Sequence, residues 1–221
     1  MVRYFLCLII ALAALGFAQT EPSTIAQALR FPMGSSLDLS LWEDLPRYEV
    51  SLSNDETPTP VSMPGYFSLA WDSSNLYILG VFAQDADTLM AELTADATEW
   101  WKADTFEVFV RQESQQPFIH IAANPAGVRF REYLATDAYQ TDSLVSDGEW
   151  ALLLSLPLGD VIADAEKGDV WELKIARGHV ALKEFSIWPK GMDFLAEDNF
   201  GKLVFVDELL SEDELLALVN P

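Results

Sequence analysis

The chain has 221 residues, half of them hydrophobic and 12% aromatic, which is enough apolar material for one globular domain with a buried core. Its 35 Asp and Glu against 13 Lys and Arg give a formal net charge of −22. This acidic excess argues against nucleic acid or an anionic membrane surface as a partner, and it favours solubility.

The first 18 residues differ from the rest and predict a secretory signal peptide. Arg3 supplies a short positive region, residues 4–15 are apolar, and Gly16–Ala18 places small residues before a cleavage point after Ala18. The apolar run is too short for a membrane span. Cleavage would remove Cys7, the only cysteine, and leave 12 Lys and Arg against 35 Asp and Glu, a net charge of −23. We therefore expect a secreted or periplasmic protein without disulfides or cysteine metal sites.

Residues 19–36 are expected to form an N-terminal extension before the main domain. Within it, Glu21–Arg30 has apolar residues at helical spacing and should stop near Pro32. Further on, the Pro-rich stretch Pro58–Pro64 is typical of a loop between edge strands.

From Tyr66 to Val206 the pattern is that of short strands separated by turn signals. A turn is expected at Asp72–Asn75, a long connection at Asp85–Thr98 and a helical turn at Asp160–Ala165. The expected strands are Tyr66–Trp71, Leu76–Ala83, Phe106–Arg111, Phe118–Asn124, Val128–Leu134, Glu149–Leu156, Val170–Arg177, Ala181–Trp188 and Gly201–Val206. Nine or ten such strands predict an all-β, antiparallel two-sheet β-sandwich of the jelly-roll kind, with short peripheral helices.

The final segment, 207–221, predicts an acidic C-terminal helix. Ser211-Glu212-Asp213-Glu214 has the spacing of a capping box, in which the Ser and the third following Glu satisfy each other's backbone groups. The helix should extend through Val219, with Leu215, Leu216 and Val219 on its apolar face.

Residues 100–110 combine a strand with two adjacent tryptophans. Phe106, Val108 and Val110 alternate with Glu107, which places Glu107 on the opposite face. Trp101 and Glu107 would lie about 20 Å apart in an extended chain, so they can meet at one ligand only if residues 102–104 turn back. An aromatic plate beside a carboxylate suits a sugar, whose C–H face stacks while its hydroxyls donate. The alternative is that both tryptophans are core and Glu107 is solvated.

The next two strands extend this surface. A tight turn at Asn124–Gly127 would set Ile121 opposite Phe130 and Ala122 opposite Arg129. The outward patch of the sheet would then hold Glu107, His120, Arg129 and Arg131.

Several motifs follow one another in order along residues 37–206. They include Ala70-Trp71-Asp72, Trp101…Asp104…Glu107, Asn124-Pro125…Gly127, Trp171…Ala176-Arg177, Ser186…Trp188-Pro189 and Phe200-Gly201-Lys202-Leu203. In this series the chain resembles the family 9 carbohydrate-binding modules, within the wider DOMON-like β-sandwiches.

The resemblance implies that a sugar is held between two aromatic side chains. The first plate falls on Trp101, the second on Phe194, six residues before the Phe-Gly, and the strand glutamate falls on Glu107. Two positions depart from the family: the second plate is Phe rather than Trp, and Ala122 stands where sugar-binding members can carry arginine. The expected ligand-binding residues are Trp101, Glu107, Phe194, His120, Arg129 and Arg131, with the two arginines as candidates for the missing cation.

Other functions remain as alternatives. A glycosidase needs two carboxyl groups about 5–10 Å apart across the scissile bond, and no acidic pair stands out, so we predict no enzymatic activity. A haem-binding DOMON-type electron-transfer domain would need axial ligands, and only His120 and the turn residue His179 offer imidazole. A structural or adhesive sandwich without a sugar ligand is the third alternative.

We expect no cofactor, with structural calcium at the acid-rich loops (Asp85 and Asp87, Asp137 and Asp142) as an alternative. The expected partner is an oligosaccharide or polysaccharide, one or two units of which are bound. Neither a nucleic acid nor a membrane span is expected, and association with glycoside-degrading enzymes is left open.

Overall fold

The structure, a computed structural model, describes residues 23–31, 36–92, 100–114, 116–132, 139–160 and 162–220. The predicted signal peptide at 1–18 lies outside these residues. Within the described part of the chain, no helix is long and apolar enough to cross a membrane.

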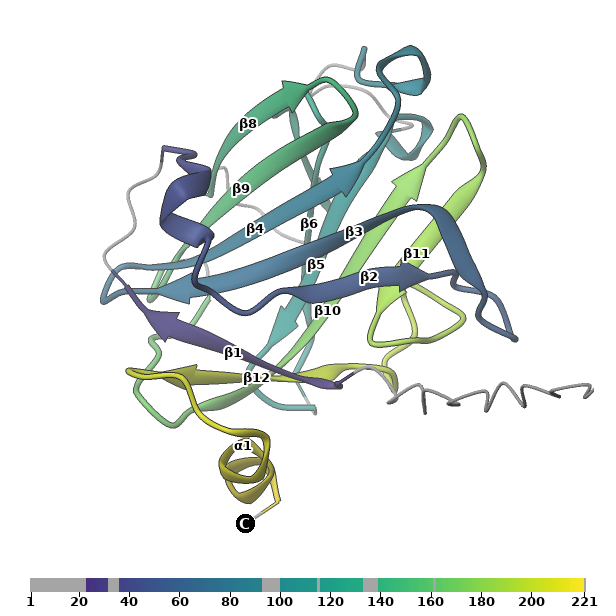
Figure 1. Ribbon diagram of the computed structural model, residues 1–221. Helices are drawn as coiled ribbons and strands as arrows, with labels where there is room; N and C mark the ends of the chain where they lie inside the picture. Colours follow the sequence, from purple (N-terminus) through teal and green to yellow (C-terminus); the bar gives the residue numbers. More distant parts are fainter. Residues whose placement is uncertain are drawn as a thin grey trace, which may run out of the picture.

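Ten strands follow one hydrogen-bonded path, β7-β6-β5-β10-β12-β1-β3-β4-β9-β8, while β11 pairs with β10 and β2 with β3. The strands are β1 (Ile25–Arg30), β2 (Tyr48–Leu52), β3 (Pro60–Trp71), β4 (Asn75–Ala83), β5 (Thr105–Arg111), β6 (Ile119–Ala123), β7 (Arg129–Glu132), β8 (Gln140–Ser146), β9 (Glu149–Pro157), β10 (Val170–His179), β11 (Glu184–Trp188) and β12 (Gly201–Val206). The path folds over so that β3, β4 and β9 cross in front of β5 and β6, with β1 and β12 along the lower side (Figure 1).

The core fills the space between these two layers. The rings of Phe82 on β4 and Phe106 on β5 have centroids 5.3 Å apart, and Phe67 on β3 lies 4.9 Å from Trp188 on β11. The core-facing side of β5 is fully buried, as its alternation predicts, and Trp171 and Trp188 join the same cluster. The prediction of a mostly β, sandwich-like domain is therefore confirmed.

The prediction of a helix within Glu21–Arg30 is wrong, because Ile25–Arg30 forms β1. This strand runs parallel to both β12 and β3, with Ile25 opposite Lys202 and Leu29 opposite Ala70. A helix of six residues is only marginally stable in isolation. As a strand, the same residues hydrogen-bond to the backbone edges of β12 and β3, which would otherwise be unpaired. The sheet is therefore not wholly antiparallel, and this part of the expected 19–36 extension is a central strand of the domain.

The stretch Pro58–Pro64, expected to be a loop, is largely strand because β3 begins at Pro60. Its first residues pair only with β2, where the register shifts between Val50 and Leu52. Proline is tolerated there because an edge position with irregular pairing needs fewer backbone donors. β2 and β8 are additional strands for which the sequence analysis named no element.

The other predicted strands are present with boundary shifts of a few residues. The helical turn expected at Asp160–Ala165 is wrong: Leu158 and Ile162 form an isolated β-bridge instead. Three short 3-10 helices lie at Leu39–Trp42, Ala86–Thr88 and Trp100–Lys102.

The C-terminal helix α1 (Glu212–Val219) and its capping box are confirmed. The Ser211 backbone N–H donates to Glu214 Oε2 at 2.8 Å, and Ser211 Oγ accepts from the Glu214 N–H at 3.4 Å. Leu215 is buried against β12, whereas Leu216 is exposed.

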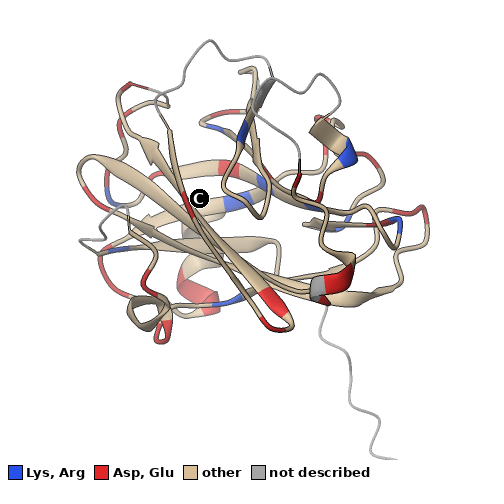
Figure 2. Cartoon of the chain, turned by 90° about the horizontal axis from the view of Figure 1, so that it is seen from above, with Lys and Arg blue, Asp and Glu red and all other residues tan. Residues whose placement is uncertain are grey.

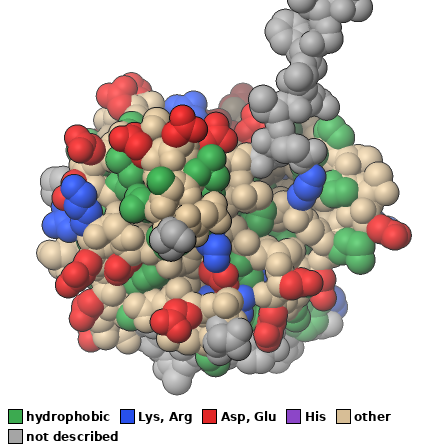
Figure 3. Space-filling model, turned by 90° about the horizontal axis from the view of Figure 1, so that it is seen from below, with side chains coloured by type: hydrophobic (Ala, Val, Ile, Leu, Met, Phe, Trp, Pro, Cys, Tyr) green, Lys and Arg blue, Asp and Glu red, His purple; other side chains and the backbone are tan. Residues whose placement is uncertain are grey.

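The acidic excess is spread over the surface. Aspartate and glutamate lie mainly in turns and loops around the sandwich (Figure 2), and they surround apolar and a few basic side chains on the face seen from below (Figure 3). The described residues contain no group of three or more His, Cys, Asp or Glu placed to hold a metal ion. Of the acids named for calcium, Asp142 accepts the Leu37 N–H at 2.8 Å, and Asp137 lies outside the described residues.

Candidate functional site

A sharp bend before β5 brings Trp101 to the same side as Glu107. Asp104, which is fully buried, holds this bend through both carboxylate oxygens. Oδ1 accepts the Val180 N–H at 2.8 Å, and Oδ2 accepts the Met90 N–H at 2.8 Å and the Gln84 amide at 2.5 Å. Three donors from three separate segments fix the loop, so the turn that the sequence required at residues 102–104 is present.

The two adjacent tryptophans have different environments. Trp100 is 9% exposed and stacks on Phe130 of β7 with ring centroids 5.7 Å apart. Trp101 is 52% exposed and meets Trp100 edge to face at 6.0 Å. Trp100 therefore anchors the loop, and Trp101 presents its ring to the exterior.

Glu107 and His120 form a polar floor on the outward face of β5 and β6. Glu107 Oε2 lies 2.9 Å from His120 Nε2, and Glu107 Oε1 accepts from Thr105 Oγ1 at 3.0 Å. The His120 ring stacks on Phe109 at 4.0 Å with only 12° between the planes. Both oxygens of a nearly buried carboxylate are thus held in place before any ligand arrives.

The loop between β11 and β12 supplies the opposite wall. Together with the floor and the tryptophan loop it encloses an open cavity of about 470 Å³. The residues lining this cavity are Asn54, Trp100, Trp101, Thr105, Glu107, His120, Phe185, Met192, Asp193, Phe194 and Leu195. Four of the six residues predicted from sequence, Trp101, Glu107, His120 and Phe194, therefore line one cavity.

Arg129 does not line this cavity, contrary to the expectation. β6 and β7 pair with Ala122 opposite Phe130 and Ala123 opposite Arg129, one residue away from the predicted register. A shift of one residue exchanges the two faces of a strand, so Phe130 occupies the site side beside Trp100. Arg129 instead donates to the Tyr139 carbonyl at 2.5 Å. Arg131 lies opposite Ile121, and its side chain is outside the described part of the structure.

The apolar wall of the cavity was not predicted from the sequence. Phe185, Met192 and Leu195 line the cavity and are 39%, 61% and 46% exposed. Large apolar side chains left exposed in one cluster are a useful signal of a binding surface, but exposure is not visible in the sequence.

His179 is not the solvated turn residue that was expected. It ends β10 opposite Glu184 on β11 and is 1% exposed. Burial lowers the pKa of its imidazole, and the nearby Arg177 guanidinium lowers it further. His179 does not line the cavity that holds His120.

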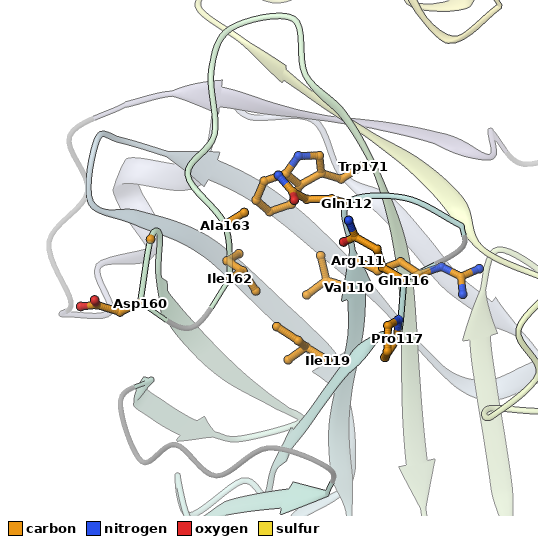
Figure 4. A pocket seen from close by; sticks show the side chains of 11 residues that line it. Val110, Arg111, Gln112, Gln116, Pro117, Ile119, Asp160, Ile162, Ala163 and Trp171 are labelled. Carbon is orange, nitrogen blue, oxygen red and sulfur yellow. The ribbon is translucent and has the colours of Figure 1, made fainter.

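A second hollow of about 310 Å³ lies at the end of the sandwich near the start of β6. Ile162 and Ala163 on one loop face Val110 and Ile119 across it (Figure 4). Its tryptophan, Trp171, is only 3% exposed and belongs to the core. This hollow offers no exposed aromatic plate, so the cavity at Trp101 is the better candidate site.

Neither protein-family models nor curated proteins give a match to this sequence. Several solved structures do match. A family 9 carbohydrate-binding module (CBM9) from Caldicellulosiruptor kristjanssonii in complex with cellotriose matches with a TM-score of 0.63 and 11% identity, covering 86% of this chain and 96% of that one. The same organism's CBM9 in complex with glucose gives 0.64 and 10%, covering 85% and 97%.

A third structure, from Bacteroides uniformis and provisionally described as a carbohydrate-binding protein, has a TM-score of 0.65 and 13% identity, covering 83% of this chain and 99% of that one. The protein thus has the fold of the family 9 modules over most of its length. At this identity the likeness establishes the fold alone, and the predicted structural resemblance is confirmed.

Proposed function

We propose that the protein is a non-catalytic carbohydrate-binding protein that holds one or two sugar units in the cavity between Trp101 and Phe194. One observation carries the proposal: an exposed tryptophan and a pre-oriented, nearly buried carboxylate line the same open cavity. The known ligands of the structural neighbours, cellotriose and glucose, support the same class of partner.

The chemistry of the lining matches a sugar. A pyranose has a flat face of C–H bonds that packs on aromatic rings, and a rim of hydroxyls that need hydrogen-bond partners. Trp101, Phe194 and Phe185 supply the aromatic surface, while Glu107 and Asn54 supply polar atoms. The volume of about 470 Å³ falls within the usual range of about 300–1,000 Å³ for small-molecule sites.

The same floor favours binding over hydrolysis. A glycosidase requires one carboxyl group to act as an acid and a second to act as base or nucleophile. Both oxygens of Glu107 already interact with His120 and Thr105, which suits a fixed hydrogen-bond acceptor. The predicted leader at residues 1–18 supports a location outside the cytoplasm, where polysaccharides are found.

A glycan array with the mature protein is the direct test. We expect retention of neutral glucan or xylan oligosaccharides, followed by saturable titration of cellotriose in a calorimeter. Absence of binding to every saccharide would overturn the proposal and favour a structural or adhesive role. A Soret band near about 400–430 nm in haem-supplemented protein would instead support the electron-transfer alternative.

A further inference from the structure

The loop that carries Phe194 is tied to the sheet by a buried lysine. Lys174, on β10, is 0% exposed. Its Nζ donates to the backbone carbonyl of Phe194 at 3.0 Å and to that of Ala196. The rings of Phe200 and Phe109 lie 4.5 and 5.5 Å from the same nitrogen. The ammonium group is therefore enclosed by loop carbonyls and aromatic faces.

Arg111, on β5, makes a second tie to the same loop. Its Nη2 donates to the Glu197 carbonyl at 2.7 Å, and its Nε donates to Glu172 Oε2 at 2.6 Å. Lys202 Nζ contacts the other oxygen of Glu172 at 2.8 Å. Burial alone would raise the pKa of Glu172, but the hydrogen bonds from Lys202 and Arg111 lower it. Glu172 is therefore a carboxylate that fixes the direction of Arg111.

Removing the Lys174 ammonium group from water opposes folding. The pKa of Lys174 is lowered to about 8: burial has the largest effect and the nearby Arg111 adds to it, whereas Asp193, Asp198 and Glu197 oppose the shift. Methionine at this position would leave the carbonyls of Phe194 and Ala196 without their ammonium donor. The desolvation cost of the buried ammonium group is thus offset by two hydrogen bonds to the loop, and these bonds fix the loop backbone.

We propose that Lys174, assisted by Arg111, is a positioning residue of the ligand site: it fixes the backbone at Phe194 and so sets the gap between that ring and Trp101. The inference rests on the proposed function, because the gap matters only if a ligand occupies it. Lys174 itself does not line the cavity and acts through the loop.

The test compares Lys174→Met with Lys167→Met, a matched loss of one positive charge. Lys167 is largely exposed, 3.6 Å from Asp207, and remote from the cavity lining. In Lys174→Met we expect cellotriose affinity to fall about tenfold or more, because the loop loses two hydrogen bonds to the sheet and must then be ordered when the sugar binds. The variant should stay folded, with a thermal midpoint within about 10 °C of the wild type, because the loss of two hydrogen bonds is partly offset by the relief of a buried charge. Amide hydrogen exchange at residues 193–198 should accelerate, and Lys174→Arg should restore part of the slow exchange. Lys167→Met should change neither affinity nor exchange.

Unchanged affinity and unchanged exchange in Lys174→Met would overturn the inference. If the wild-type protein binds no saccharide, the proposed function fails, yet the exchange rates still decide whether the tether exists. Should Lys174→Met not fold, Arg111→Gln tests the same loop from β5. Normal exchange at residues 195–198 in that variant would then count against the inference.

Discussion

His120 Nε2 lies 2.9 Å from Glu107 Oε2, although the two residues are not directly opposite each other in the sheet. In the ladder, Glu107 pairs with Ala122, and His120 pairs with Phe109. The contact is therefore a diagonal one across neighbouring strands, made possible because Ala122 leaves space beside Glu107. On this face the small side chain of Ala122 lies beside Glu107, and the imidazole of His120 meets the carboxylate from the diagonal position.

Glu107→Gln should weaken sugar binding by about 5- to 10-fold, because a hydrogen bond to a charged acceptor contributes about 1.5–3 kcal/mol and one to a neutral acceptor about 0.5–1.5 kcal/mol. The amide keeps the shape of the side chain, so the fold should persist. Calorimetric titration of cellotriose measures the effect. Glu113→Gln, an exposed acid in the turn after β5, serves as the control. Equal sugar affinity in both variants would show that Glu107 does not contact the ligand.

Trp101→Ala should abolish binding while costing little stability, because the side chain is half exposed and meets the Trp100 ring edge to face rather than in a buried stack. Trp100→Ala is the informative comparison, since this buried ring packs on Phe130 and His120. A buried Trp→Ala change costs about 3–5 kcal/mol. Thermal unfolding and sugar affinity, measured on both variants, separate the two roles. If Trp101→Ala unfolds, Trp101 is a core residue and the proposed binding site is wrong.

Much of this site could be predicted from local sequence. Alternation along residues 105–110 identified the strand and the face of Glu107, and the need for a turn at residues 102–104 followed from chain length alone. Which of the two tryptophans points outward was given only by the family resemblance. In the structure it depends on packing against Phe130, a contact between distant segments.

The failures share a non-local cause. The helical spacing of residues 25–30 was real, but a parallel pairing with β3 and β12 decided their conformation. The β6–β7 register depended on how Asn124 closes its turn: its Oδ1 accepts the N–H groups of Ala126 and Val128. Gly127, at φ 73°, completes the turn in a conformation that favours glycine. The turn residues were recognised, but the one-residue register they impose was not.

The cavity should discriminate against acidic sugars. The described residues that line it include the acids Glu107 and Asp193 and no lysine or arginine. A uronate would therefore bring a third negative charge into a partly desolvated site, without a cation to pair with it. We expect glucuronic acid to bind at least about tenfold more weakly than glucose, with part of the difference recovered in Asp193→Asn. Competition titration measures both ligands, and preferential uronate binding would contradict this electrostatic picture.

Arg129 was a candidate for that cation, and the observed register places it opposite Ala123, a core-facing residue. Arg129→Ala should therefore leave the affinity for neutral sugars within about twofold of the wild type, well below the loss of about 1.5–3 kcal/mol expected for a lost charged hydrogen bond. Titration with cellotriose checks this directly. A tenfold loss of cellotriose affinity in a folded Arg129→Ala variant would show that Arg129 does contribute to binding.

His179, which is 1% exposed at the end of β10, should make the stability of the protein sensitive to acid. Neither of its ring nitrogens has a hydrogen-bond partner within the described structure, and burial lowers the pKa of the ring. The folded protein therefore protonates His179 only at a lower pH than the unfolded chain, in which the imidazole takes up a proton as the pH falls through about 6.5. Because the unfolded state then binds more protons, the free energy of unfolding must decrease from pH 7.5 towards pH 5.5.

His179→Leu removes the titrating group at similar volume, so its unfolding free energy should depend less on pH over this window. Urea denaturation at pH 7.5, 6.5 and 5.5 on both proteins measures the difference, and carboxylates that titrate lower contribute equally to both. The gap between variant and wild type should widen in favour of the variant as the pH falls. Parallel curves would mean that His179 reaches a partner or solvent in solution, and that the ring is not held neutral by the fold.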